Sequence, residues 1–239
     1  MVAYEIMTTR KDVFVDGDYY HIYNRGNSKQ LIFLNNEDKE RFTKLLYLCN
    51  SNKNINFRDD IVNQKIDAFD FDRSNSIVYI GAWVLMPNHF HIYLSPKSPR
   101  GTLGNIDCIP LFMNKLSTAY SMYFNKKNDR TGKLFEGTFK STCVTSDQQA
   151  KYNFSYIHLN PVKLIDPKWR EEGIKDYKKT LAFLDKYQWS SYQDYRGRKR
   201  LENKIISPED FPDYFSDPKV FDDEIFDWLR PDIDSLPNT

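Results

Sequence analysis

The protein has 239 residues, of which 40% are hydrophobic, 15% aromatic and 28% charged, and its mean hydropathy is −0.67. This composition is typical of a folded globular protein and excludes a disordered, a collagen-like or a membrane-spanning chain. The formal net charge of +1 conceals an uneven distribution, because residues 201–239 carry eleven acidic and three basic side chains, a net of −8. The other 200 residues carry 31 basic and 22 acidic side chains, a net of +9. We therefore expect a basic body over residues 1–200 and an acidic, aromatic extension over residues 201–239.

Cysteine usage and the lack of apolar segments bear on the compartment. The three cysteines, Cys49, Cys108 and Cys143, are odd in number and show no CxxC spacing. The sequence therefore favours neither a disulfide framework nor a zinc ribbon. An apolar leader and a run of about 18 apolar residues are both missing, so we expect a cytoplasmic protein.

Hydrophobic periodicity and turn residues predict alternating strands and helices. In chain order these are a strand at 19–23, a polar loop at 24–28, a helix from 36 to about 49, strands at 76–86 and 89–94, a helix at 109–125, a strand at 139–144 and a helix from 146 to 160. Residues 51–75 are polar and poorly patterned, as in a long connection. The last helix begins with a capping box, Ser146 followed by Gln149, and ends before Pro161. This order predicts an α+β protein with a mostly antiparallel sheet and helices packed on it.

One pair of histidines suggests a metal site. His89 and His91 are separated by Phe90 in a segment predicted to be a strand. Side chains at i and i+2 of a strand project from the same face, so both imidazoles can converge on one ion. The spacing alone also fits half-buried histidines that are only hydrogen-bonded.

The predicted helix from 146 to 160 has two distinct sides. Ala150, Phe154 and Ile157 form an apolar stripe, which we expect to dock on the sheet. A polar side lies roughly 120° away and need not be buried. It carries Gln149, Tyr152, Tyr156, Asn160 and Lys163. Tyr156 and Asn160, at i and i+4, are neighbours on it, although tyrosines in such positions often only cover the edge of a core.

The histidine pair and the tyrosine helix together suggest phosphodiester chemistry. Tyrosine can act as a covalent nucleophile, and a divalent cation can neutralise the oxygens of the phosphate that it attacks. Two histidines and a carboxamide provide ligands and leave positions open for substrate. The GxSxG, Walker-type, Rossmann and HExxH motifs are all absent, which disfavours the corresponding hydrolase and nucleotide-binding classes.

These residues belong to two longer motifs. WVLMPNHFH at 83–91 and YIHLNPVK at 156–163 together resemble the paired signature of the REP-associated tyrosine transposases. That family belongs to the HUH superfamily of single-strand DNA endonucleases, with the single-tyrosine insertion-sequence transposases. Flanking segments match in the same order: YHIYNRGN at 20–27, GKLFEG at 132–137 and WSSY at 189–192. The similarity extends over roughly residues 14–196.

The resemblance implies a ferredoxin-like HUH endonuclease fold and a complete catalytic set. His89 and His91 would hold Mg²⁺ or Mn²⁺, Asn160 would complete the metal site, and Tyr156 would be the nucleophile. Tyr156 would attack a phosphate of single-stranded DNA, leaving a 5′-phosphotyrosine link and a free 3′ hydroxyl. The implied partner is single-stranded DNA with hairpin or palindromic elements, bound by a monomer or a homodimer.

The two remaining histidines receive other roles. His158 points roughly 160° away from Asn160 on the helical wheel, so we assign it a structural or supporting role. His21 is assigned to packing or DNA contact rather than to metal binding.

DNA phosphates are expected to be bound by basic side chains in and around the loop at 126–133. This basic cluster comprises Arg25, Lys115, Lys126, Lys127, Arg130, Lys133 and Lys140. Aromatic side chains nearby are candidates for stacking on exposed bases. They are Tyr120, Tyr123, Phe135 and Phe139.

The chain departs from the family pattern in two places. Leu164 to Pro167 stand where relatives usually have an Ala-Gly pair, and Thr138 stands where they often have arginine. An alternative function is that of a domesticated hairpin-DNA-binding or regulatory protein without transposition activity, and a metal-storage or oxidoreductase domain has little beyond the histidine pair to support it. The acidic extension is too rich in aromatic residues for a disordered brush. We expect it to pack on the body and partly to cover the basic DNA-binding groove.

Overall fold

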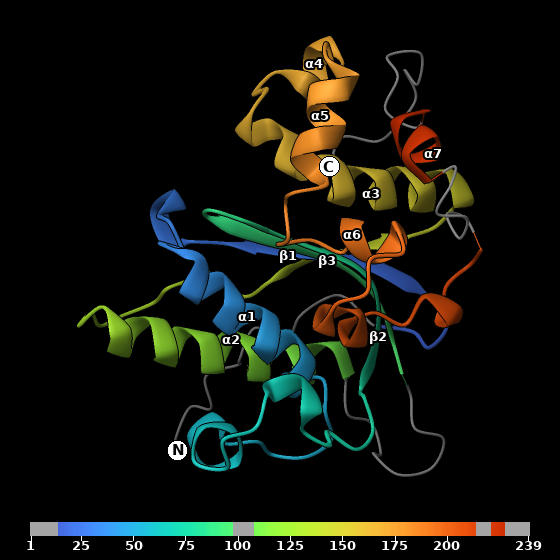
Figure 1. Ribbon diagram of the computed structural model, residues 1–239. Coiled ribbons are helices and arrows are strands. Elements are labelled where there is room, and N and C mark those ends of the chain that lie inside the picture. The colour runs from blue at the N-terminus through green and yellow to red at the C-terminus, as the bar shows by residue number, and fades with distance from the viewer. Residues whose placement is uncertain (1–13, 98–107, 214–220, 228–239) are drawn as a thin grey trace, which may run out of the picture.

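The computed structural model describes residues 14–97, 108–213 and 221–227 (Figure 1). Its centre is an antiparallel sheet with the strand order β2-β3-β1-β4. The strands are β1 (Tyr19–Arg25), β2 (Val78–Met86), β3 (His89–Pro96) and β4 (Lys140–Val144). Helices α1 (Asn36–Cys49) and α2 (Cys108–Lys127) lie on one face of the sheet, and α3 (Asp147–Leu159) crosses the other. The predicted α+β class with an antiparallel sheet is confirmed.

Shorter helices surround this framework. They are α4 (Trp169–Glu172), α5 (Tyr177–Leu184), α6 (Tyr192–Tyr195) and α7 (Phe221–Asp227), with single turns η1 (Asn27–Lys29), η2 (Phe57–Val62), η3 (Ala68–Asp70), η4 (Asn160–Leu164), η5 (Leu201–Ile205) and η6 (Pro208–Asp210). No helix in the described ranges is long and apolar enough to cross a membrane.

The β2–β3 hairpin is buried on both faces, which explains its nearly continuous apolar sequence. Trp83, Phe90 and Ile92 face α1 and α2 in one core, whereas Val84 and Tyr93 face α3 in a second. Strand β1 pairs with β3 on the side away from β2. It extends through Arg25, so Asn24 and Arg25 belong to the strand and not to the polar loop expected to begin at residue 24.

An internal carboxylate joins α1 to α2. Asp38 is fully buried and accepts hydrogen bonds from Leu34 N (2.8 Å), Tyr123 Oη (3.1 Å) and Lys127 Nζ (2.8 Å). Asn35 caps α1 by accepting from Asp38 N at 3.1 Å. These bonds fix the first turn of α1 against the last turn of α2.

Helix α3 begins where the capping motif predicts. Ser146 Oγ accepts from Gln149 N at 3.2 Å, while Gln149 Oε1 accepts from Thr145 N at 2.8 Å, one residue earlier than in the usual capping box. The α-helix ends at Leu159, and the chain continues through Pro161 as the turn η4. The stripe expected to dock is buried, with Ala150, Phe154 and Ile157 exposed by 7% or less.

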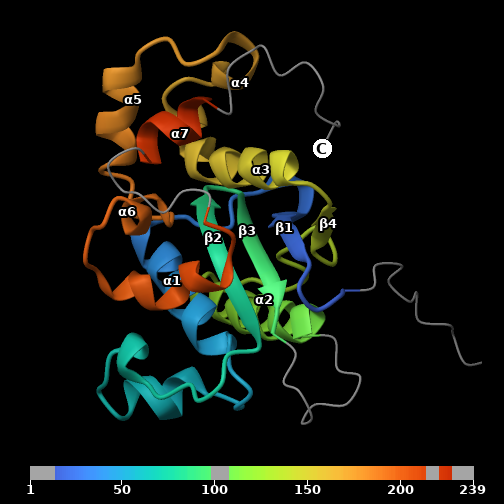
Figure 2. The same ribbon diagram turned by 90° about the vertical axis from the view of Figure 1, so that its right-hand side faces the viewer.

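The described parts of the acidic extension lie against the body. Ile205 is fully buried in the core beneath α1 and α2, and Ser207 N donates to Ile80 O at 2.8 Å. Phe211 covers Gly81 so closely that a Cβ there would lie 2.8 Å from its ring, so the glycine makes room for it. Helix α7 packs on α3, as Figures 1 and 2 show, and Phe221 is fully buried among aromatic side chains of α3 and α6.

Candidate active site

The two paired histidines project from the start of β3 toward α3. His89 lies opposite Arg25 of β1 and Met86 of β2, and His91 opposite Tyr23 and Val84. The ring centroids of the two histidines are 5.1 Å apart with perpendicular planes. Phe90 between them points to the opposite face, where it packs on Phe42.

Helix α3 brings a tyrosine and a carboxamide to the same place. The Tyr156 ring is 5.5 Å from the His91 ring between centroids. Asn160, at the end of the helix, is only 3% exposed, and its side chain lies close enough to His89 and Tyr156 to influence the pKa of each. The structure thus gathers His89, His91, Tyr156 and Asn160 from two elements that are distant in sequence. Asn160 is more deeply buried than its position on a polar helix side suggested.

Three buried polar atoms in this centre lack hydrogen-bond partners among the described residues. They are Nε2 of His91, Oδ1 of Asn160 and Nδ1 of the adjoining His21. A buried polar atom without a partner costs roughly 1–3 kcal/mol, so such atoms call for a ligand. Imidazole nitrogen and carboxamide oxygen are both metal-binding atoms, and these residues therefore fit a divalent ion. No group of three or more His, Cys, Asp or Glu side chains suited to a metal occurs in the described ranges. A metal bound at this centre would therefore need the Asn160 amide as a further ligand.

His21 was not among the predicted site residues, yet it belongs to this centre. Its Nε2 lies 2.8 Å from His91 Nδ1, and the residue is 3% exposed. The contact with His21 occupies Nδ1 of His91, so Nε2 of His91 points away from β1. Histidines that bind metal ions are commonly oriented in this way, by a hydrogen bond to the ring nitrogen that does not bind the metal. Burial leaves no room for the DNA contact considered from sequence. The pairing depends on how β1 aligns with β3, which local sequence patterns do not reveal.

Burial keeps the imidazoles neutral. It lowers the pKa of His89 to about 4, with Asn160 opposing and the nearby charges of Lys163 and Arg25 adding to the effect. Burial likewise lowers the pKa of His91 well below its ordinary value, and His21 and His89 add to the decrease. Neutral imidazole is the form that binds metal ions. At neutral pH the imidazoles of His89 and His91 are therefore already in the form that can bind a metal ion, and neither has to lose a proton first.

The phenol of Tyr156 is partly enclosed. Burial raises its pKa, while the charge of Arg170 and the carboxamide of Asn160 act in the opposite direction. The Tyr152 ring stacks parallel to the Tyr156 ring, with centroids 6.2 Å apart. The ring of Trp169, a residue of α4, also stacks on the Tyr156 ring, with centroids 6.5 Å apart. Aromatic neighbours therefore fix the ring plane, and the polar groups gather near its hydroxyl end.

His158 is structural, as its direction on the helix predicts. It is fully buried, and its Nδ1 donates to Phe154 O at 2.8 Å because a carbonyl can only accept. Its Nε2 then accepts from Ser191 Oγ at 2.8 Å. The histidine thereby ties α3 to the WSSY segment beside β2.

Two lysines of the basic cluster serve internal contacts. Lys115 Nζ donates to Ser51 O (2.5 Å) and Lys53 O (2.6 Å), which holds the 51–75 connection on α2. Lys127 Nζ bonds Asp38 and, at 2.7 Å, Glu37. The structure gives both ammonium groups internal partners, and we omit them from the DNA-binding surface proposed below.

The other members of the basic cluster lie nearer the surface. Arg25 forms an ion pair with Glu136 beside the mouth of the histidine site. Arg130 is half-buried and lies over the Phe124 ring, and three lysines are exposed. These are Lys126, Lys133 and Lys140.

The aromatic residues suggested for base stacking fall into two groups. Tyr120 is fully buried and Phe135 only 6% exposed, so neither can stack on a base without unfolding, and that expectation is wrong for both. Tyr123 and Phe139 are half-buried. Phe139 lines a groove of about 930 Å³ between α2 and the 132–139 loop, where Lys133 is also found.

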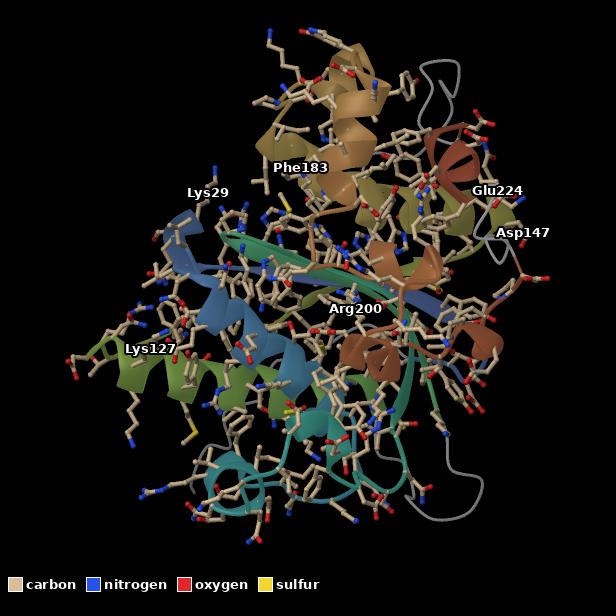
Figure 3. All side chains as sticks on the ribbon, viewed as in Figure 1. Lys29, Lys127, Asp147, Phe183, Arg200 and Glu224 are labelled. Atoms are coloured by element: carbon tan, nitrogen blue, oxygen red, sulfur yellow. The ribbon has the colours of Figure 1, made fainter. Side chains whose placement is uncertain are left out.

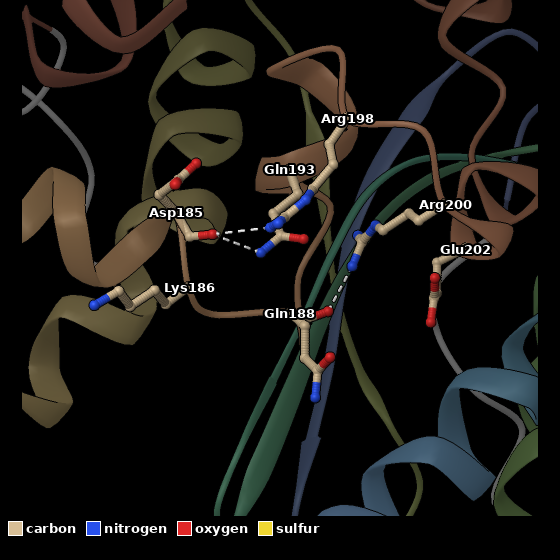
Figure 4. A pocket seen from close by; sticks show the side chains of 7 residues that line it. All are labelled: Asp185, Lys186, Gln188, Gln193, Arg198, Arg200 and Glu202. Carbon is tan, nitrogen blue, oxygen red and sulfur yellow. Dashed lines mark hydrogen bonds between the residues drawn. The ribbon is translucent and has the colours of Figure 1, made fainter.

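Two further features lie away from this centre. In Figure 3, Glu224 of α7 is far across the molecule from Lys127, so the described helix of the acidic extension does not cover that end of the basic cluster. A polar cavity of about 590 Å³ is shown in Figure 4. Its Arg200 donates to Gln188 O at 2.6 Å and pairs with buried Asp194, so its charge is already compensated.

Comparisons with known proteins give matches among solved structures. No family model and no curated protein matches the chain. Among solved structures it is similar to a REP-associated tyrosine transposase bound to a REP hairpin, with 13% identity and a TM-score of 0.44. The match covers 82% of this chain and 90% of that one.

Proposed function

We propose that the protein is a metal-dependent single-strand DNA endonuclease and strand transferase that cleaves and rejoins hairpin-bearing DNA. The observation that carries the proposal is the convergence of Tyr156 with unpartnered His91 Nε2 and Asn160 Oδ1 in one buried centre. A phenol nucleophile beside a metal-binding set suits attack on a phosphodiester. The motifs around these residues are similar to those of a family with this chemistry.

In the proposed reaction, Tyr156 Oη attacks the phosphorus of a DNA phosphodiester. The phenol loses its proton, a tyrosine–phosphate bond forms at the 5′ side, and the bond to the 3′ oxygen breaks. The departing oxygen takes up a proton and becomes a 3′ hydroxyl. Because the phosphotyrosine retains the bond energy, the reverse attack by a 3′ hydroxyl can rejoin DNA without a high-energy cofactor.

His89, His91 and Asn160 are the residues that would hold Mg²⁺ or Mn²⁺. When bound, such an ion would neutralise negative charge on the non-bridging phosphate oxygens. The His21–His91 contact keeps His91 Nε2 directed into the site. Trp169 and Tyr152 limit the rotation of the nucleophile ring, which holds its oxygen near the same place.

The substrate is proposed to be a single strand carrying a hairpin, bound through its phosphates. Arg25, Lys126, Arg130, Lys133 and Lys140 remain the candidates for these contacts. A cytoplasmic location and action as a monomer or a homodimer remain predictions.

The test is formation of a covalent protein–DNA adduct. Synthetic single strands that form a hairpin stem, labelled at the 3′ end, are incubated with the full chain and Mn²⁺, then separated under denaturing conditions. We expect an adduct from the unaltered protein and from Tyr177→Phe, an exposed tyrosine on α5 that serves as the control. Tyr156→Phe should form none; if it forms the same adduct, the nucleophile is another residue, with Tyr152 next to be tested.

Metal binding has its own readout. Mn²⁺ should raise the melting temperature of the protein, and chelation should reverse the rise. His91→Ala and Asn160→Ala should abolish this shift, whereas Cys143→Ala, an exposed site outside the centre, should retain it. Hairpin binding without an adduct in either Mg²⁺ or Mn²⁺ would instead indicate a DNA-binding protein that no longer cleaves.

A further inference from the structure

Helix α4 places an arginine beside the proposed nucleophile. Arg170 Cζ lies 5.2 Å from the centre of the Tyr156 ring, and Arg170 Nη2 donates to Tyr152 Oη at 2.9 Å. The neighbouring Trp169 is 4% exposed and stacks on Tyr156, which anchors this short helix against α3. The guanidinium is thus held against the two parallel tyrosine rings at a defined position.

The charge of Arg170 is not compensated within the described chain. It forms no ion pair with a described carboxylate, and its single hydrogen bond is to a neutral phenol. The nearest acidic residues on its helix do not change this. Glu172 pairs with Lys168 at 3.2 Å and with Lys175, and Glu171 is exposed with no such bond to the guanidinium. The remaining N–H donors of Arg170 face solvent on an exposed residue.

A second positive charge lies near the histidine pair. Lys163 follows Asn160 on the turn η4, is exposed, and acts electrostatically on His89. It also forms no ion pair with the described carboxylates. The nucleophile and the histidine pair are therefore flanked by Arg170 at the tyrosine side and Lys163 at the histidine side, an arrangement suited to a chain of phosphates passing between them.

We propose that Arg170 binds a backbone phosphate of the DNA strand adjacent to the bond that is cleaved, and that the same guanidinium orients the Tyr152–Tyr156 pair. This assignment rests on the proposed function and adds a substrate contact from outside the family motifs. A planar guanidinium can cover an aromatic ring, donate along one edge to Tyr152 and present its other edge to a phosphate. A lysine ammonium group is a point charge, so it can replace the phosphate contact of Arg170 but not the second edge of the guanidinium that is held against Tyr152.

The test measures DNA binding separately from cleavage. All variants are made in the full chain with Tyr156→Phe, which keeps the ring but forms no phosphotyrosine. A synthetic fluorescent single strand that forms a hairpin stem is titrated by anisotropy over a series of salt concentrations. The control is Lys168→Ala, which removes an equal charge from an exposed side chain near α4 that already pairs with Glu172.

Arg170→Ala should weaken hairpin binding about tenfold at low salt, as expected for a charge-assisted contact. It should also reduce the slope of log K against log salt by about 0.7, the amount associated with one phosphate of a single strand. Arg170→Lys should restore most of this slope. With Tyr156 present, Arg170→Lys should still form the adduct more slowly than the unaltered protein, because the bond to Tyr152 is lost.

The outcomes separate the two proposals. Equal affinity and salt slope for Arg170→Ala and Lys168→Ala would overturn the phosphate contact, while adduct formation by the unaltered protein would still support the proposed function. A lower melting temperature of Arg170→Ala with an unchanged salt slope would show a purely structural role and would likewise overturn it. Absence of both hairpin binding and adduct in the unaltered protein would refute the proposed function itself.

Discussion

Replacing Ser191 by alanine should loosen the catalytic helix from the sheet. Ser191 is fully buried beside β2, and its Oγ accepts from Trp83 N at 3.0 Å. The same hydroxyl lies 2.8 Å from His158 Nε2, to which it donates. One small side chain therefore connects α3, two residues after Tyr156, to the strand that pairs with β3.

The expected cost follows from the groups left behind. Alanine removes both bonds and leaves Trp83 N–H and His158 Nε2 buried without partners. Each orphaned group costs roughly 1–3 kcal/mol, so the unfolding free energy should fall by about 2–5 kcal/mol. This is a large share of the roughly 5–15 kcal/mol typical of a folded domain.

Ser190 offers a matched control, because it is also fully buried but its hydroxyl accepts only a long bond of 3.4 Å from Tyr192 N. Urea unfolding at pH 7, followed by tryptophan fluorescence, should show a loss below about 1 kcal/mol for Ser190→Ala. If Ser191→Ala is no less stable than Ser190→Ala, the His158–Ser191 bond does not anchor the helix and the reasoning is refuted.

Three other predictions concern stability. Burial lowers the pKa of His158 to about 3, so as the pH falls the unfolded chain protonates this imidazole before the folded chain does. The contribution of the neutral, buried His158 to the unfolding free energy is therefore complete above pH 6.5 and declines toward pH 3. It falls by about 2 kcal/mol between pH 7 and pH 5. The other buried histidines add to the loss in the unaltered protein, so urea titrations should show a loss about 2 kcal/mol smaller in His158→Gln than in the unaltered protein. Asp38→Ala should cost about 3–5 kcal/mol because Leu34 N–H and the Tyr123 hydroxyl lose their buried acceptor and, among the described carboxylates, Lys127 keeps only Glu37. Glu40→Ala, which breaks an exposed pair, should cost less than about 1 kcal/mol in the same assay. Phe221→Ala should lower the unfolding free energy by about 3–5 kcal/mol through the cavity that it leaves against α3, while Asp223→Ala on the exposed side of α7 should have little effect; equal values would show that α7 does not stabilise the body.

Local patterns were sufficient for the framework of the site. The two-residue spacing of His89 and His91 correctly placed them on one face of β3, and the four-residue spacing of Tyr156 and Asn160 placed both on the same side of α3. These inferences depend only on strand and helix periodicity, which the surrounding residues obey. Phe90, the apolar residue between the two histidines, packs on Phe42 at the opposite face of the sheet, as the alternation of side chains along a strand predicts.

Other features depend on contacts that no local pattern contains. His21 reaches His91 only through the register of β1 with β3, and Arg170 meets Tyr152 only because a four-residue helix folds back on α3. Lys115 and Lys127 occupy ordinary helix positions, and their sequence neighbours give no sign of the carbonyls and carboxylates that bind them. Tertiary packing decides each of these contacts, so charge and spacing along the sequence do not reveal them.

The position of α7 also affects how the protein is made. Translation proceeds from the N-terminus, so α3 emerges from the ribosome well before residues 221–227, which pack on it. Until those residues have been synthesised, Phe154 and His158 lack an aromatic neighbour that covers them in the folded chain. The helix that carries Tyr156 therefore obtains its full packing only after residues 221–227 have been synthesised, later than both histidines of β3.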